Sequence, residues 1–112
     1  MRASFIPEAV EGNARAGRVE VAHGSFSTPC FMPVGTRGAV RHLTSADLTR
    51  LGVEVVLANT YHLMLRPGAA VVRDLGGLAA FAAWDGLTLT DSGGYQIFSL
   101  QPRVDDDGAE FR

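Results

Sequence analysis

The sequence contains no lysine, a single cysteine and no long apolar run. All 10 basic residues are arginine and stand against 12 acidic residues, so the formal net charge is −2. A chain of this charge has no general electrostatic attraction for nucleic acid, although a local arginine patch is compatible with it. We interpret the preference for arginine, together with abundant alanine and glycine, as genomic base composition.

The lone Cys30 excludes a disulfide within the chain and has no cysteine or histidine at metal-ligand spacing. Because free cysteine is usually buried, we expect a packed or half-buried thiol here. The N-terminus lacks a basic segment followed by an apolar one, and no apolar run approaches the roughly 20 residues that cross a bilayer. We therefore expect a cytoplasmic protein that has no membrane partner.

The length of 112 residues is enough for one small domain but is well below the roughly 250 residues of a complete α/β barrel. With 46% hydrophobic and 20% charged residues, the composition is that of a soluble globular protein with a packed core. The chain is expected to be either one small domain or part of a larger one.

The first third of the sequence predicts β-structure. In residues 3–33, Val19 and Val21 alternate with charged residues, and turns are expected at residues 12–13 and 23–24. Residues 30–34 then predict a short buried strand that ends at a glycine. We expect an antiparallel, hairpin-rich segment at the start of the fold.

Helices and strands alternate in the following residues. Thr44 and Asp47 predict a capping box at the start of a helix. The apolar run 53–58 predicts a strand covered on both faces. Pro67 is suited to the first turn of another helix, and 87–90 predicts a further strand. This alternation indicates βαβ units and a parallel sheet, and fits an open sheet and a closed barrel equally well.

A glycine pair and an acidic turn mark the ends of further predicted elements. Residues 76–77 are expected to end the helix that begins near residue 67. Residues 105–108 predict a solvated turn, and 109–112 predict the beginning of a strand.

A carboxylate, a hydroxyl and two glycines directly follow the last predicted strand. Asp91 would stand at the carboxyl end of that strand, where α/β proteins bind substrates. Its carboxylate either caps the following turn or binds a ligand and accepts a proton. Ser92, Gly93 and Gly94 form either an ordinary turn or a backbone nest for a ligand. Tyr95 is either a core aromatic residue or a stacking surface.

A second polar cluster follows the neighbouring predicted strand. If the two strands are parallel, Asn59 and Asp91 can approach each other, and the amide would fix the orientation of the carboxylate. His62 is a candidate base without a definable partner, so a structural role is favoured. Arg66 either binds an anion near a helix N-terminus or, as the pattern favours, pairs with a nearby acid.

Five motifs occur in a fixed order along the chain: TPCFMPVGT at 28–36, NTYHLMLRPG at 59–68, LGGL at 75–78, WD at 84–85 and TDSGGYQ at 90–96. Together they resemble the N-terminal part of the bacterial tRNA-guanine transglycosylases, which are also called queuine tRNA-ribosyltransferases. The resemblance covers nearly all of the chain. It implies an α/β fold, an irregular (β/α)₈ barrel preceded by a small antiparallel sheet, of which this chain holds only part.

The domain organisation follows from the same resemblance. Residues 1–112 are expected to be the N-terminal part of a single catalytic domain. Within it, the antiparallel segment would occupy about 1–33 and the first β/α units about 30–112. The barrel would be incomplete in this chain.

The resemblance implies an enzyme of queuosine biosynthesis, a glycosyltransferase of the pentosyltransferase class. Such an enzyme exchanges the guanine at the wobble position of a tRNA with a GUN anticodon for 7-aminomethyl-7-deazaguanine. One aspartate attacks the ribose C1′ to form a covalent tRNA-enzyme intermediate, and a second removes a proton from the incoming base. Asp91 matches the second aspartate. The same motif implies that Asp91, Ser92, Gly93, Gly94 and Tyr95 line the base pocket, with Tyr95 stacking on the base.

The nucleophilic aspartate and the Cys/His zinc site of the family lie beyond the position of Arg112. The resemblance therefore implies zinc and a homodimer for a full-length protein, with no metal ligand in this chain, and we expect residues 1–112 alone to lack exchange activity. A noncatalytic or degenerate barrel homologue that supports another subunit is the alternative. The intact run from Asp91 to Tyr95 speaks against it.

Overall fold

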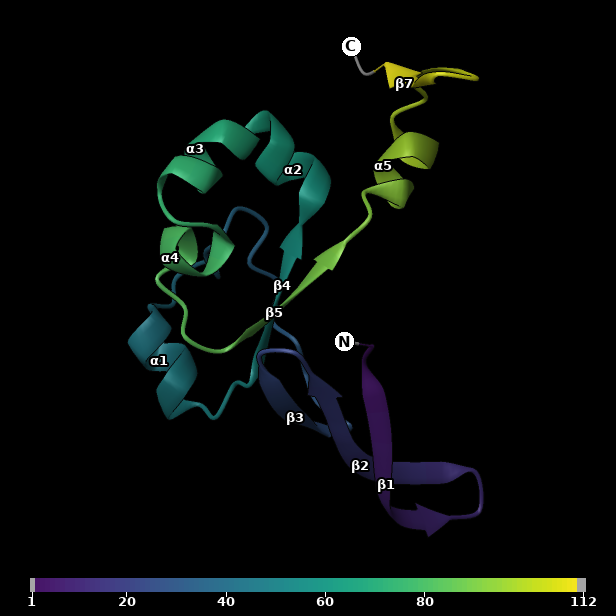
Figure 1. Ribbon diagram of the computed structural model, residues 1–112, viewed down its shortest axis with the longest axis vertical. Helices are drawn as coiled ribbons and strands as arrows, with labels where there is room; N and C mark the ends of the chain where they lie inside the picture. The colour runs from purple at the N-terminus through teal and green to yellow at the C-terminus, as the bar shows by residue number, and fades with distance from the viewer. Residues whose placement is uncertain (1, 111–112) are drawn as a thin grey trace.

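The fold combines an antiparallel sheet, a parallel strand pair and short helices (Figure 1). The computed structural model describes residues 2–110. In chain order, its elements are β1 (Ser4–Glu11), β2 (Ala14–Val21), β3 (Gly24–Thr28), α1 (Ser45–Arg50), β4 (Val55–Asn59), α2 (Thr60–Leu65), α3 (Ala69–Asp74), α4 (Leu78–Ala82), β5 (Leu87–Asp91), α5 (Gly94–Ser99), β6 (Arg103–Asp105) and β7 (Gly108–Glu110). Within residues 2–110, none of these helices has the length and apolar character needed to span a membrane.

The predicted hairpins at the start of the chain are present. β1, β2 and β3 pair antiparallel in sequence order, with turns at residues 12–13 and 22–23. Gly17 lies inside β2 because a Cβ there would stand 2.2 Å from the Ile6 carbonyl oxygen and 2.8 Å from the Phe5 ring. Such close approach of a neighbouring strand is a recurrent reason for glycine within a sheet.

The strand predicted at residues 30–34 is reduced to one bridge. Val34 pairs in parallel with Leu57, and the Leu57 N–H donates to the Pro33 carbonyl oxygen at 3.0 Å. Prolines lack a backbone donor, which limits the pairing of this segment. Cys30 is exposed, so the expected packed thiol is wrong, and Phe31 is 83% exposed.

The parallel pair β4–β5 lies at the centre of the fold and confirms the two strands predicted there. Its register runs from Val55 opposite Leu87 to Asn59 opposite Asp91. The Val34 bridge lies on the other edge of β4, because it uses the N–H and C=O of Leu57 that do not face β5. The parallel segments therefore follow one another in sequence order, as successive units of a β/α barrel do.

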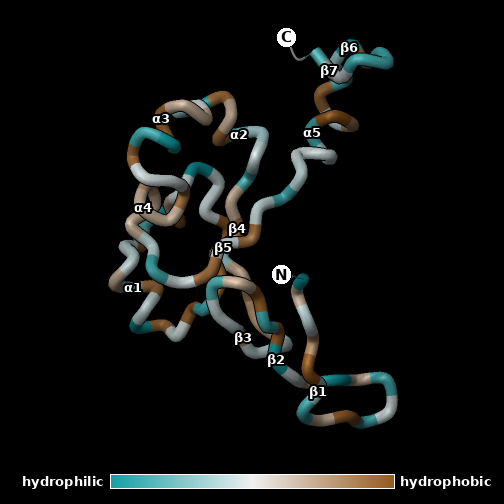
Figure 2. The backbone as a smooth tube through the Cα atoms, in the orientation of Figure 1, coloured by the Kyte–Doolittle hydropathy of each residue, from teal (hydrophilic) through white to brown (hydrophobic). Residues whose placement is uncertain are grey.

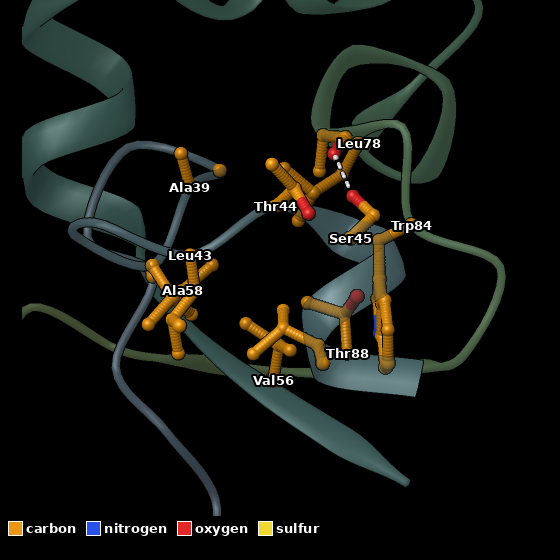
Figure 3. Close-up of a pocket in the computed structure, with 14 residues that line it drawn as sticks. Ala39, Leu43, Thr44, Ser45, Val56, Ala58, Leu78, Trp84 and Thr88 are labelled. Carbon is orange, nitrogen blue, oxygen red and sulfur yellow. Dashed lines mark hydrogen bonds between the residues drawn. The ribbon is translucent and has the colours of Figure 1, made fainter. Parts of the chain in front are cut away.

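One face of the parallel pair packs against α1 and α4. Leu48, Val56 and Trp84 form the buried core, and the Trp84 indole N–H donates to the Leu87 carbonyl oxygen at 2.9 Å. Figure 2 shows apolar residues gathered around β4 and β5. A pocket of about 310 Å³ lies beside this core, and Figure 3 shows Val56, Trp84 and Ser45 among the residues that line it.

The helix predicted between Pro67 and the glycine pair at 76–77 is present as α3, and two further short helices, α2 and α4, flank it. Gly76 and Gly77 end α3 as expected, but α4 begins at the next residue. Both glycines have positive φ, 94° and 95°, which turns the chain without ending the helical region. Pro67 precedes α3 instead of occupying its first turn, and α2 was not predicted at all.

The capping box predicted at the start of α1 is confirmed. The Asp47 N–H donates to Thr44 Oγ1 at 3.2 Å, and the Thr44 N–H donates to Asp47 Oδ2 at 2.9 Å. Gly52, with φ 71°, follows the last turn of the helix. The helix therefore starts and stops where its sequence signals predict.

The C-terminal elements project away from the rest of the described chain (Figure 1). The predicted turn at 105–108 joins β6 and β7, and Asp105 Oδ1 accepts hydrogen bonds from the N–H groups of Asp107 and Gly108. The strand predicted from residue 109 is confirmed as far as Glu110. Residues 111–112 lie outside the described part of the chain.

The antiparallel sheet meets the amino ends of β4 and β5. The Ser27 N–H donates to Glu54 Oε1 at 3.1 Å, and a Cβ on Gly24 would lie 3.6 Å from the side chain of Leu87. The opposite, carboxyl ends of β4 and β5 carry Asn59 and Asp91. The packing against the first sheet and the predicted polar cluster are thus at different ends of the parallel strands.

Candidate functional site

The two polar residues at the carboxyl edge of the parallel pair are in direct contact. Asn59 and Asp91 are register partners, and the Asn59 Nδ2 donates to Asp91 Oδ2 at 2.7 Å. Asn59 is only 8% exposed. The contact expected from parallel pairing is present.

The Asp91 carboxylate also accepts two backbone hydrogen bonds. The N–H groups of Thr60 and Gly93 donate to Oδ1 at 3.2 and 3.3 Å. The Thr60 hydroxyl donates to the backbone oxygen of Asp91. Each carboxylate oxygen has about two acceptor positions, so Oδ1 is saturated by these bonds while Oδ2 keeps one lone pair after the Asn59 bond. Asp91 thus caps the following turn and still has one position open to a ligand.

Asn59 links the carboxylate to the start of α2. Its Oδ1 accepts a hydrogen bond from the His62 N–H at 3.0 Å, so Asn59 is the N-cap of that helix. Because Oδ1 faces α2, Nδ2 must face Asp91. Sequence reasoning found the contact with Asp91 but missed the cap. Asparagine is one of the favoured N-cap residues, so an asparagine at the end of a buried strand is the signal that could have revealed it.

The segment after Asp91 is a tight turn into α5. The Ser92 Oγ accepts a hydrogen bond from the Gly94 N–H at 3.2 Å. Gly93 is buried at φ 71° as the N-cap of α5, and a Cβ there would lie 3.2 Å from the Tyr61 Cβ. A glycine therefore suits both the backbone angle and the space. Tyr95 is 74% exposed, so it does not belong to the core of the described residues.

Gln96, which sequence reasoning had treated only as part of a motif, lies beside this turn. Its Oε1 is buried and has no hydrogen-bond partner among residues 2–110. The same atom would be 3.8 Å from a Cβ placed on Gly93. No feature of the sequence marks this oxygen, because its burial follows from the turn.

The candidates His62 and Arg66 lie on and just after α2, and within the described chain their side chains do not hydrogen-bond to the Asp91 carboxylate. The His62 ring contacts the Tyr61 ring edge to face, with centroids 5.4 Å apart. The ion pair favoured for Arg66 is absent from the described chain, whose paired arginines are Arg18, Arg50 and Arg73. Residues 2–110 contain no group of three or more Cys, His, Asp or Glu side chains that could hold a metal ion.

Comparison with known proteins places this chain in a family. The sequence profile described as queuine tRNA-ribosyltransferase matches residues 10–112. The chain belongs to the queuine tRNA-ribosyltransferase family. A relative of that name from Gloeobacter violaceus is 52% identical over 111 residues, which cover 97% of this chain and 29% of the relative.

Two further relatives called queuine tRNA-ribosyltransferase agree with the assignment. One from Thermus thermophilus is 54% identical over 110 residues, covering 96% of this chain and 29% of the relative. That of Bacillus licheniformis is 46% identical over 114 residues, covering 100% of this chain and 30% of the relative. The chain thus spans less than a third of the queuine tRNA-ribosyltransferases that it matches.

Within this member of the queuine tRNA-ribosyltransferase family, the site combines an oriented carboxylate with an exposed aromatic ring. Asp91 has a fixed orientation and one open acceptor position, and Tyr95 lies four residues further on with its ring exposed. A carboxylate can accept a proton from a heterocyclic N–H, and an aromatic ring can stack on a planar base. Both groups are thus of types that a base-binding site uses.

Proposed function

We propose that this chain is the N-terminal part of a tRNA-guanine transglycosylase. The protein would exchange guanine at the wobble position of a tRNA with a GUN anticodon for 7-aminomethyl-7-deazaguanine. The observation that carries the proposal is the Asp91 carboxylate, oriented by three donors at the carboxyl edge of the parallel strands, in a chain of this family. A cytoplasmic location is part of the proposal, because tRNA is the substrate.

Asp91 would act as the base of the second half of a double displacement. A nucleophilic aspartate elsewhere in the protein first attacks the ribose C1′, and guanine leaves. The incoming base then loses a proton and attacks C1′ in turn, releasing the nucleophile. We assign the accepted proton to Oδ2 of Asp91, because Oδ1 already accepts the N–H groups of Thr60 and Gly93. Asn59 would support this step by holding Oδ2 in place.

The turn after Asp91 would form one wall of the base pocket. Ser92, Gly93 and Gly94 bring the backbone close to a planar ligand, and Tyr95 would stack on its face. The exposure of the Tyr95 ring supports this role, since a stacking residue needs a free face. The target nucleotide has to leave the anticodon stack before its ribose can react.

The remaining parts of the enzyme are proposed to lie after Arg112. The chain spans 29% of the Gloeobacter relative and 30% of the Bacillus relative, so most of each relative has no counterpart in it. We place the rest of the (β/α)₈ barrel, the nucleophile, the Cys/His zinc ligands and the homodimer contacts in that remainder. Residues 1–112 would be one segment of a single catalytic domain.

Residues 1–112 alone are therefore expected to show no base exchange. The measurement is the incorporation of labelled guanine into a tRNA transcript. A graft of this segment in place of the matching part of the Thermus thermophilus relative, with which it is 54% identical, should exchange guanine. Exchange by residues 1–112 alone would contradict the proposed division of the site. A folded but inactive graft would favour the noncatalytic alternative.

A further inference from the structure

A small pocket at the carboxyl end of the parallel strands is lined by basic side chains. Arg37, His62, Leu65 and Arg66 border a volume of about 200 Å³. Within the described chain, none of these four side chains hydrogen-bonds to Asp91. The pocket therefore needs an explanation of its own.

The loop after the Val34 bridge and the helix α2 bring these side chains together. The Gly35 N–H donates to the Leu57 carbonyl oxygen at 2.7 Å, which fixes the chain beside β4 two residues before Arg37. On the other side, α2 starts directly from the end of β4. His62 lies in its first turn, and the Arg66 N–H donates to the His62 carbonyl oxygen at 2.9 Å. Both segments follow the carboxyl ends of parallel segments, and Asp91 also stands at such an end.

The positive charge of this pocket is not neutralised within the described chain. Arg37 and Arg66 are exposed and have no ion pair among residues 2–110, whereas Arg18, Arg50 and Arg73 have acidic partners. Two guanidinium groups that share a pocket without a carboxylate attract an anion. The planar guanidinium fork matches the oxygens of a phosphate, and the imidazole of His62 can add an N–H donor.

We propose that Arg37, His62 and Arg66 bind a backbone phosphodiester of the RNA whose base is presented to Asp91. This inference rests on the proposed function, since it assumes that RNA is the substrate. A chain with a net charge of −2 has no general attraction for RNA, so the phosphate contacts have to come from a local patch. Its two arginines are exposed and have no ion pair among residues 2–110, and the patch lies at the same end of the sheet as Asp91.

The test compares two double variants of the grafted full-length enzyme that lose the same charge. Arg37→Ala with Arg66→Ala removes the patch. Arg15→Ala with Arg50→Ala is the control, because Arg15 lies in β2, in the sheet that meets the amino ends of β4 and β5, and Arg50 ends the helix before β4. Affinity for an anticodon stem-loop RNA is measured by fluorescence anisotropy between about 50 and 200 mM salt. Steady-state exchange gives kcat and the KM values for RNA and for guanine.

The patch variant should show a smaller salt dependence of RNA affinity. The patch is proposed to bind one phosphodiester, and the loss of one phosphate contact lowers the slope of log K against log salt by about 0.7 to 0.9, so a decrease of that size is expected. The KM for RNA should rise about tenfold or more, while kcat at saturating RNA and the KM for guanine stay within twofold. The control should keep the wild-type slope. The corresponding Arg→Lys double variant should recover most of the slope, because it keeps the charge.

An unchanged slope and KM in the patch variant, or an equal loss in the control, would overturn the proposal. A measurement with inorganic phosphate distinguishes a site for RNA from a site for the free phosphate ion. If millimolar phosphate raises the melting temperature of the wild type but not of the patch variant, while both bind RNA equally, the pocket binds the free ion and not RNA. RNA binding is measured without turnover, so a graft that fails to exchange guanine but shows the expected slope change refutes the proposed function and leaves this site standing.

Discussion

The Asp91 carboxylate serves the fold and the proposed chemistry with different lone pairs. Its Oδ1 holds the turn into α5 and the start of α2 through two backbone N–H groups. Its Oδ2 is oriented by Asn59, whose own oxygen caps α2. The alternative between a structural and a functional aspartate is thus not exclusive, because one carboxylate has enough acceptor positions for both roles.

Exchanging the side-chain types of positions 59 and 91 tests this network. Asp91→Asn places an amide N–H₂ against the Asn59 Nδ2, so two donors face each other, and we expect the free energy of unfolding to fall by about 2 kcal/mol. In the double variant Asn59→Asp with Asp91→Asn, the amide at 91 donates to the carboxylate at 59, which still accepts the His62 N–H. This variant should recover more than half of the loss. Thermal or denaturant unfolding of the wild-type graft and of both variants gives the free energies of unfolding.

Equal stability of the single and double variants would show that the Asn59 contact with Asp91 does not depend on donor and acceptor type.

Sequence reasoning could predict this contact because both residues end strands that pair in parallel. It missed the cap of α2, although asparagine is a favoured N-cap residue, and it could not predict the buried Gln96 oxygen, because that burial depends on how the chain turns after the strand.

At the scale of elements, the sequence correctly predicted those helices and strands whose signal lies within a few neighbouring residues. The capping box of α1 and the apolar strand β4 were predicted because a few neighbouring residues specify them. The helix predicted in the crossover between β4 and β5 is present as α3, but α2 and α4 on either side of it were missed. The two missed helices depend on the Asn59 cap and on glycines that redirect the chain, and such short helices lack the periodicity that reveals longer ones.

The capping box of α1 predicts a dependence of stability on pH. Hydrogen bonds from the side chain and backbone of Thr44, and then from Arg50, lower the pKa of Asp47 below its ordinary value. A lowered folded-state pKa means that the contribution is present above the ordinary aspartate pKa of about 4 and is lost as the pH falls through the folded pKa. The stability advantage of the wild type over Asp47→Asn should therefore be largest near neutral pH and shrink below pH about 4.

Denaturant unfolding of both proteins at a series of pH values checks this expectation. Arg50→Ala is a useful companion, because it removes the hydrogen bond that lowers the pKa of Asp47 least and leaves both Thr44 hydrogen bonds. A difference between wild type and Asp47→Asn that stays constant across the acidic range would contradict the assigned cause.

At the scale of the whole molecule, structural and proposed catalytic roles lie at opposite ends of the parallel strands. The antiparallel sheet packs on the amino ends, and the Asp91 network and the basic pocket lie at the carboxyl ends. The sequence predicted both layers and their order. It could not distinguish an open sheet from a barrel, and the described chain contains two parallel strands and one bridge, which do not close a barrel.

The central claim is that Asp91 accepts the proton of the incoming base. The most direct test is the rate of labelled guanine incorporation into tRNA by the Asp91→Asn graft, with RNA affinity measured in parallel as evidence of a folded protein. General-base catalysis contributes about 10²- to 10⁴-fold, so the rate should fall at least about a hundredfold while RNA affinity stays within twofold. A variant that binds RNA normally and exchanges guanine at more than about a tenth of the wild-type rate would contradict the claim.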